Sequence, residues 1–122
     1  MKVRWIIAAI LLGSTAIAGS LVSKSVAAVT PTPVAVAATV TISNFQFGPK
    51  VVRIKASGEV TWQVKEGTHT VTADDGSFES PAMSAGQKFS HTFAKAGTYR
   101  YYCSFHGSKG GHDMAGTVTV GR

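Results

Sequence analysis

Residues 97–106 read Gly-Thr-Tyr-Arg-Tyr-Tyr-Cys-Ser-Phe-His, and this stretch decides the fold. Its first seven residues alternate as in a half-buried β-strand, so that Tyr99, Tyr101 and Cys103 share one face. Tyr102 lies on the opposite face, beside the thiol but on the outer surface. The stretch therefore predicts a strand that carries Cys103, the only cysteine of the chain, into the core of an all-β domain.

The chain from residue 39 onward has the same β character. Val and Thr are frequent, apolar and polar residues alternate, and Gly or Asp-Gly breaks separate the runs, with no apolar stripe of helical period. We expect Ser57 and Gly58 to form a turn between two strands. About seven to eight short strands then make a β-sandwich or small barrel. The expected strands are 39–42, 51–56, 59–64, 69–73, 87–93, 98–103 and 116–120.

The first 28 residues read as a leader. A basic start at Lys2 and Arg4 precedes an apolar run over residues 5–22, followed by small residues that suit cleavage of a signal peptide. The run is also just long enough to span a bilayer, so an uncleaved N-terminal anchor helix is the alternative. We expect three segments: a signal peptide or anchor over 1–28, a flexible Pro, Ala and Val linker over 29–38, and one domain over 39–122.

A leader of this kind predicts a periplasmic or otherwise extracytoplasmic protein, either free or anchored through its N-terminus. Exported proteins usually pair their cysteines as disulfides, but Cys103 has no intrachain partner. Metal ligation accounts for a lone thiol outside the cytoplasm, because coordination shields the thiolate from oxidation.

The charge of the chain argues against nucleic-acid binding. The formal net charge of the chain is +6. Without the three basic residues of the leader, nine basic and six acidic side chains remain. The basic residues are spread singly rather than clustered as a nucleic-acid-binding surface requires. A mildly positive domain favours an acidic protein partner.

Four side chains offer donors that suit copper. Cys103, His106 and Met114 supply a thiolate, an imidazole and a thioether within one short segment, and His69 supplies a second imidazole far upstream. Two imidazoles, a thiolate and a weak axial methionine form the ligand set of a blue-copper electron-transfer site. We predict one copper ion that joins these distant parts of the chain. The alternative is that Cys103 is only a buried core thiol and that the histidines are incidental.

Other side chains compete for the same role. His112 lies close enough to Met114 to replace it, but an imidazole opposes the soft axial donor of these sites, and a solvated histidine is favoured. His91 is expected to be a partly buried strand residue with a hydrogen bond, and Met83 a packing side chain in a loop. A zinc site is chemically possible, although structural zinc prefers four strong ligands.

The chain resembles the cupredoxins, specifically their small plastocyanin-like members. The resemblance covers residues 39–121 and implies a Greek-key β-sandwich with one type 1 copper ion. It also implies that His69, Cys103 and His106 are the strong ligands, that Met114 is the long axial ligand, and that electrons pass through an exposed edge of His106. The resemblance rests on segments 47–49, 58–62, 67–71, 97–103 and 114–120, which follow the order of the family.

Two features depart from the family pattern. Seven residues separate His106 from Met114, and the glycines among them predict a loop of unusual freedom. Thr68 stands where relatives often carry asparagine or proline before the first histidine.

By the same resemblance, Tyr102 marks a second surface at which electrons can reach the site.

We therefore predict a monomeric one-electron carrier that cycles copper between Cu(I) and Cu(II), and not an enzyme. No nucleophile triad, poised carboxylate pair or phosphate loop appears in the sequence. Its expected partners are extracytoplasmic redox proteins, such as a cytochrome or a membrane electron-transfer complex. The alternative is a copper-binding module for metal delivery or storage, with Met83 and His112 as extra donors. A domain that keeps the fold only to dock a partner is the third possibility.

Overall fold

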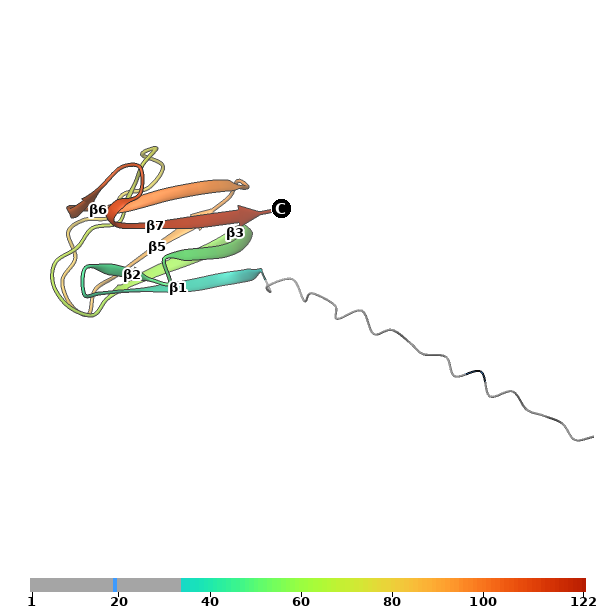
Figure 1. Cartoon of the computed structure of the whole chain (residues 1–122), viewed down its shortest axis with the longest axis horizontal. Coiled ribbons are helices and arrows are strands. Elements are labelled where there is room, and N and C mark those ends of the chain that lie inside the picture. The colour runs from blue at the N-terminus through green and yellow to red at the C-terminus, as the bar shows by residue number, and fades with distance from the viewer. Residues whose placement is uncertain (1–18, 20–33) are drawn as a thin grey trace, which may run out of the picture. The chain divides into compact units, whose positions relative to one another are not determined.

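The protein is built of β-strands in the part that the structure, a computed structural model, describes: residue 19 and residues 34–122. No helix occurs among these residues. The all-β prediction is therefore confirmed (Figure 1). Along the chain the strands are β1 (Ala35–Ser43), β2 (Gln46–Gly48), β3 (Val51–Val64), β4 (Thr72–Ala73), β5 (Lys88–Phe93), β6 (Gly97–Ser108) and β7 (His112–Gly121).

The leader expected over residues 1–28 lies outside the described residues, apart from Gly19. The same holds for the first part of the expected linker, residues 29–33. Among the residues that the structure describes, no helix is long and apolar enough to cross a membrane.

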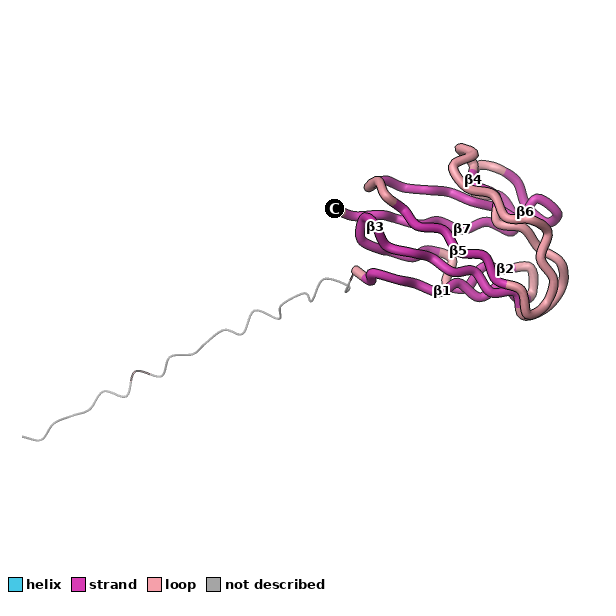
Figure 2. The backbone as a smooth tube through the Cα atoms, turned by 180° about the vertical axis from the view of Figure 1, so that it is seen from behind, coloured by secondary structure: helices cyan, strands magenta, loops and turns pink. Residues whose placement is uncertain are grey.

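The strands form two layers that share the long strand β3 (Figure 2). The second half of β3 pairs in parallel with β1 and antiparallel with β5, while β2 pairs with the other edge of β1. The first half of β3 pairs in parallel with β7, which is followed by β6 and β4. Apolar side chains of both layers meet between them, as in the predicted sandwich.

Strand β3 corrects the prediction of two strands, 51–56 and 59–64, joined by a turn. Ser57 and Gly58 instead lie inside one continuous strand, with Ser57 at a φ of 70°. A side chain at residue 58 would lie 2.8 Å from the carbonyl oxygen of Val36 on β1, so only glycine allows this close approach. The local irregularity lets a single strand pass from one layer to the other.

The other strand boundaries also differ in places. Strand β1 begins at Ala35, so it includes the last four residues of the expected linker, three of which pair with β3: Ala35, Ala37 and Ala38. Of the strand expected over 69–73, only Thr72–Ala73 is a strand, and His69 forms an isolated bridge with Met83. The short strand β2 was not predicted at all. Three residues carry too little alternation to be recognised from sequence.

The core is centred on Trp62, which is fully buried on β3. Val60 and Val64 lie on the same face of the strand and are also fully buried, as the alternation predicts. Tyr101 enters this core from β6 and meets the Trp62 ring edge-on, with 5.3 Å between the ring centroids. Cys103 follows two residues later and has no exposed surface. The thiol therefore lies at the end of a densely packed scaffold.

Candidate metal centre

Three of the four predicted ligands converge in the structure. The donor atoms of His69, Cys103 and His106 all lie within 4.8 Å of one another. The sulfur of Cys103 is 3.8 Å from Nδ1 of His69 and 3.5 Å from Nδ1 of His106. His69 lies 34 residues before Cys103 in the sequence, so the fold itself brings the three donors together.

The ring of His69 is fixed from behind by the backbone. Its Nε2 lies 3.0 Å from the carbonyl oxygen of Glu66, which can only accept, so Nε2 donates the hydrogen bond. Burial lowers the pKa of His69 below 6.5, although the Glu66 carbonyl acts in the opposite direction. The neutral ring with its proton on Nε2 turns a free Nδ1 lone pair toward Cys103, as a metal ligand requires.

The sulfur of Cys103 has its own backbone contact. The amide of Thr70 donates a hydrogen bond to the sulfur over 3.5 Å, and the Thr70 hydroxyl accepts one from the amide of Ser104 over 2.8 Å. The neighbouring Tyr102 is only partly buried and lies on the opposite face of β6, as its position in the alternation predicts. The amide donor therefore holds the sulfur in place beside the two histidines.

The segment that carries His106 and Met114 is a hairpin rather than a free loop. Strands β6 and β7 continue past the expected boundaries at 103 and 116, and Gly110 and Gly111 at its tip have φ angles of 91° and 84°. The glycines thus close a turn, where we expected them to loosen the segment. Two pairs of residues face one another in this hairpin: Gly107 with Asp113 and Ser108 with His112.

A contact with a distant turn holds the tip of the hairpin. The amide of Gly110 donates a hydrogen bond to Oδ2 of Asp74 over 2.9 Å. The amide of Asp74 in turn donates to the carbonyl oxygen of Arg100 on β6. The tip of the ligand hairpin is therefore connected to β6 through Asp74.

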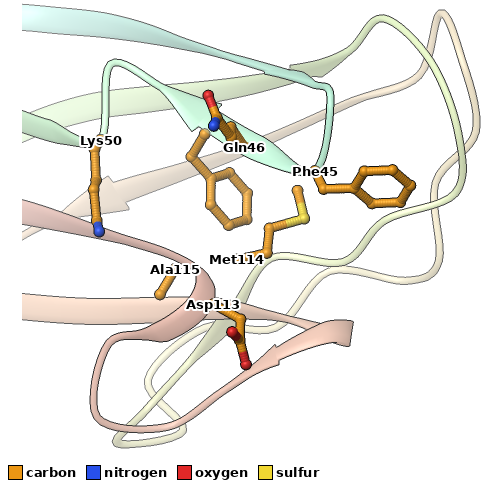
Figure 3. Close-up of a pocket in the computed structure, with 7 residues that line it drawn as sticks. Phe45, Gln46, Lys50, Asp113, Met114 and Ala115 are labelled. Carbon is orange, nitrogen blue, oxygen red and sulfur yellow. The ribbon is translucent and has the colours of Figure 1, made fainter.

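Met114 lies at the base of the hairpin. Its side chain is 2 % exposed and belongs to the same apolar core as Cys103. In Figure 3 the side chain runs from β7 toward Phe45. The side chain of His112, the alternative axial donor, is exposed. Its ring nitrogens are not among the donor atoms that converge in the part of the chain that the structure describes.

The exposed edge of the cluster is apolar. His106 is exposed, whereas His69 and Cys103 are buried. Phe45 and Phe105, which are 64 % and 57 % exposed, line the surface hollow next to His106. The cluster therefore has one accessible side, through the ring of His106.

The donor set fits one type 1 copper ion. It combines two imidazole nitrogens and a thiolate within 4.8 Å of one another with a buried methionine in the same core. Among the described residues no carboxylate joins the cluster, which sets it apart from sites for hard cations. A structural zinc site would call for a fourth strong ligand in place of a thioether.

Sequence reasoning missed four residues around this cluster: Phe45, Glu66, Thr70 and Asp74. Glu66 and Thr70 act on ligands through their backbone groups, which leave no mark on side-chain patterns. Asp74 acts across a gap of 36 residues. Phe45 lies in a two-residue turn between β1 and β2, a turn that the missed strand β2 concealed.

Comparisons with known proteins agree with this geometry. The profile of the family described as copper binding proteins, plastocyanin/azurin family, matches residues 34–121. A plastocyanin from Scenedesmus fuscus is 35 % identical over 86 residues, which cover 61 % of this chain and 85 % of the relative.

Two solved structures extend the likeness to the fold. A methionine-to-leucine mutant of amicyanin in its oxidised form superimposes with a TM-score of 0.62 and 28 % identity, covering 74 % of this chain and 92 % of amicyanin. A purple cupredoxin from Nitrosopumilus maritimus gives a TM-score of 0.60 and 29 % identity, covering 69 % of this chain and 99 % of that protein. The resemblance inferred from sequence motifs is therefore confirmed.

Proposed function

The chain belongs to the plastocyanin/azurin family of copper-binding proteins, and on this basis we propose that it is a one-electron carrier with a mononuclear type 1 copper site. His69, Cys103 and His106 would be the strong ligands and Met114 the weak axial one. Copper bound there supplies a Cu(II)/Cu(I) couple. The observation that carries the proposal is the convergence of the three strong donors on one point at the end of a rigid sandwich.

The surrounding residues suit a site that changes charge without moving its donors. The carbonyl of Glu66 holds the buried ring of His69, and the amide of Thr70 holds the sulfur of Cys103. Asp74 holds the tip of the hairpin that carries His106 and Met114. Contacts of this kind orient ligands and tune a metal from outside its coordination sphere.

We propose that electrons cross at the exposed edge of His106. Its ring is the accessible donor of the cluster, and the surface around it is apolar. A carrier role, rather than conversion of a substrate, is supported by a donor set in which the protein itself supplies four ligands, since catalytic metal sites usually keep an open position.

The location and partners of the carrier are part of the same proposal. An extracytoplasmic site of action is supported by the leader-like sequence of residues 1–28 and by the lone cysteine. Redox proteins outside the cytoplasm, such as a cytochrome or a membrane complex, would then give and take the electron. The excess of basic over acidic residues favours a partner with an acidic surface.

A role in copper delivery or storage is less well supported. That role would benefit from soft donors at the surface that exchange copper readily. Met83, one of the two candidates, is 2 % exposed, and its backbone is paired in both directions with His69. The methionine therefore belongs to the scaffold that holds a ligand.

Two rates separate the carrier from a delivery protein. The full-length chain loaded with copper should show a reversible one-electron couple and rapid electron self-exchange, measured by NMR line broadening in mixtures of the two oxidation states. It should also release copper slowly to an excess of EDTA. Slow self-exchange together with rapid release would contradict the carrier proposal and support delivery.

A further inference from the structure

The turn between β1 and β2 has an unfavourable conformation for its sequence. Ser43 pairs with Gln46, so Asn44 and Phe45 form a two-residue hairpin turn. Their φ angles are 50° and 56°. Two positive φ angles define a type I′ turn, which favours asparagine followed by glycine. Asparagine fits this pattern, but phenylalanine does not, because its Cβ is crowded in the left-handed region.

The strained residue is also exposed. The Phe45 side chain is 64 % exposed, so burial in the core does not compensate for its backbone conformation. Its ring instead meets the ring of His106 edge-on, with 4.8 Å between centroids and an interplanar angle of 70°. It also approaches His69 at 6.1 Å. Edge-to-face pairs at these separations are attractive.

Asn44, the other residue of the turn, is connected to His69, the buried histidine ligand. The amide of Asn44 donates a hydrogen bond to Oε1 of Glu66 over 2.7 Å. The carbonyl oxygen of Glu66 accepts the hydrogen bond from Nε2 of His69. One turn thus contacts the exposed ligand through a ring and the buried ligand through a chain of two hydrogen bonds.

We propose that the Asn44–Phe45 turn is a clamp that positions both histidine ligands, with Phe45 holding the exposed ring of His106 and Asn44 holding His69 through Glu66. The two are positioning residues and coordinate no metal. The inference rests on the proposed copper site. It explains why a bulky side chain occupies a position that favours glycine: the ring restrains the one donor that the sandwich leaves exposed.

The first test needs no copper. In the copper-free full-length chain, the ring protons of His106 should carry an NMR ring-current shift from Phe45, which Phe45→Ala abolishes and Phe45→Tyr retains. Thermal unfolding of the same chains separates the clamp from general stability. Phe45→Gly should melt higher than Phe45→Ala, since glycine accepts the positive φ. Unchanged His106 resonances in Phe45→Ala would overturn the clamp.

The second test measures copper release to excess EDTA through the loss of thiolate-to-copper absorption. Phe45→Ala and Phe45→Gly should release copper about tenfold faster than wild type, and Phe45→Tyr within about twofold of it. Phe105→Ala is the matched control, because it removes a similarly exposed ring whose centroid is 6.3 Å from that of His106. It should have a much smaller effect.

The outcomes distinguish the clamp from the copper site on which it rests. Release from Phe45→Ala at the wild-type rate, or equal acceleration by Phe105→Ala, would overturn the clamp while leaving the site intact. Failure of the wild-type chain to form the absorption band would instead overturn the proposed function. Equal acceleration in Phe45→Ala and the higher-melting Phe45→Gly would support the clamp, because release that followed stability would be slower from Phe45→Gly.

Discussion

Thr70 and Cys103 lie 33 residues apart in the sequence, yet the amide of Thr70 donates a hydrogen bond to the sulfur of Cys103 over 3.5 Å. One residue further along, the amide of Ser104 returns a hydrogen bond to the Thr70 hydroxyl. This reciprocal pair joins the segment of the first histidine to the segment of the thiolate. The threonine hydroxyl is thus part of the link between the two halves of the site.

The hydroxyl of Thr70 should therefore matter before any metal binds. Thr70→Val keeps the shape of the side chain but leaves the Ser104 amide without its acceptor, and we expect the copper-free chain to lose about 1 kcal/mol of unfolding free energy. Thr70→Ser keeps the hydroxyl and should retain most of the wild-type free energy of unfolding. Urea denaturation measures both, and equal stability of the two variants would contradict this role of the hydroxyl.

Met114 should act as the axial ligand and His112 should not. Met114→Leu keeps the apolar volume in the core, so copper should still bind, but without the thioether donor to Cu(II) the reduction potential should rise. His112→Ala should leave the potential and the electron paramagnetic resonance spectrum unchanged. Voltammetry and the spectrum check both variants. A shift in His112→Ala with none in Met114→Leu would reverse the assignment.

Asp74 should stabilise the tip of the ligand hairpin. Asp74→Ala removes the acceptor of the Gly110 amide, so hydrogen exchange at this amide should accelerate roughly fivefold, as expected for the loss of a hydrogen bond of about 1 kcal/mol. Asp75→Ala is the control, because the Asp75 carboxylate accepts from the amide of Ser77 within its own turn. Equal acceleration in the two variants would argue against a specific contact.

Acid should destabilise the copper-free chain. Burial lowers the pKa of both His69 and His91 below 6.5 in the folded state. The unfolded chain therefore binds more protons than the folded one below about pH 6.5. Stability is fully present above this pH and is lost as the pH falls toward the folded-state pKa values.

Urea denaturation between pH 7 and pH 5 measures this loss of unfolding free energy. His91→Phe should make it smaller, because this ring packs against Phe78 and Phe93, with centroids at 4.9 and 4.7 Å, and phenylalanine keeps the packing without the titration. A stability that stays constant over this range in the wild-type chain would contradict the burial of neutral histidines.

The parts of the fold that were predictable from sequence depend on local alternation. The inward face of Val60, Trp62 and Val64 and the buried position of Cys103 follow from a period of two residues, which strands impose wherever they form. The convergence of His69 with Cys103 was expected from donor chemistry and family resemblance. Alternation alone does not bring distant segments together.

The parts that escaped prediction depend on contacts between distant segments. Ser57 and Gly58 look like a turn, but the close approach of β1 makes them an irregularity within one strand. Gly110 and Gly111 look like a source of freedom, but pairing across the hairpin makes them its turn. In each case glycine is compatible with both the expected and the observed conformation of the backbone. Only the pairing with a neighbouring strand decides which of the two forms.

The visible absorption spectrum of the full-length chain loaded with one equivalent of Cu(II), recorded beside that of Cys103→Ser, tests the central claim most directly. A thiolate donor from Cys103, held with the rings of His69 and His106, predicts an intense charge-transfer band in the wild-type chain that disappears in the variant. A copper complex of the wild-type chain without that band would contradict the type 1 site and with it the proposed electron carrier.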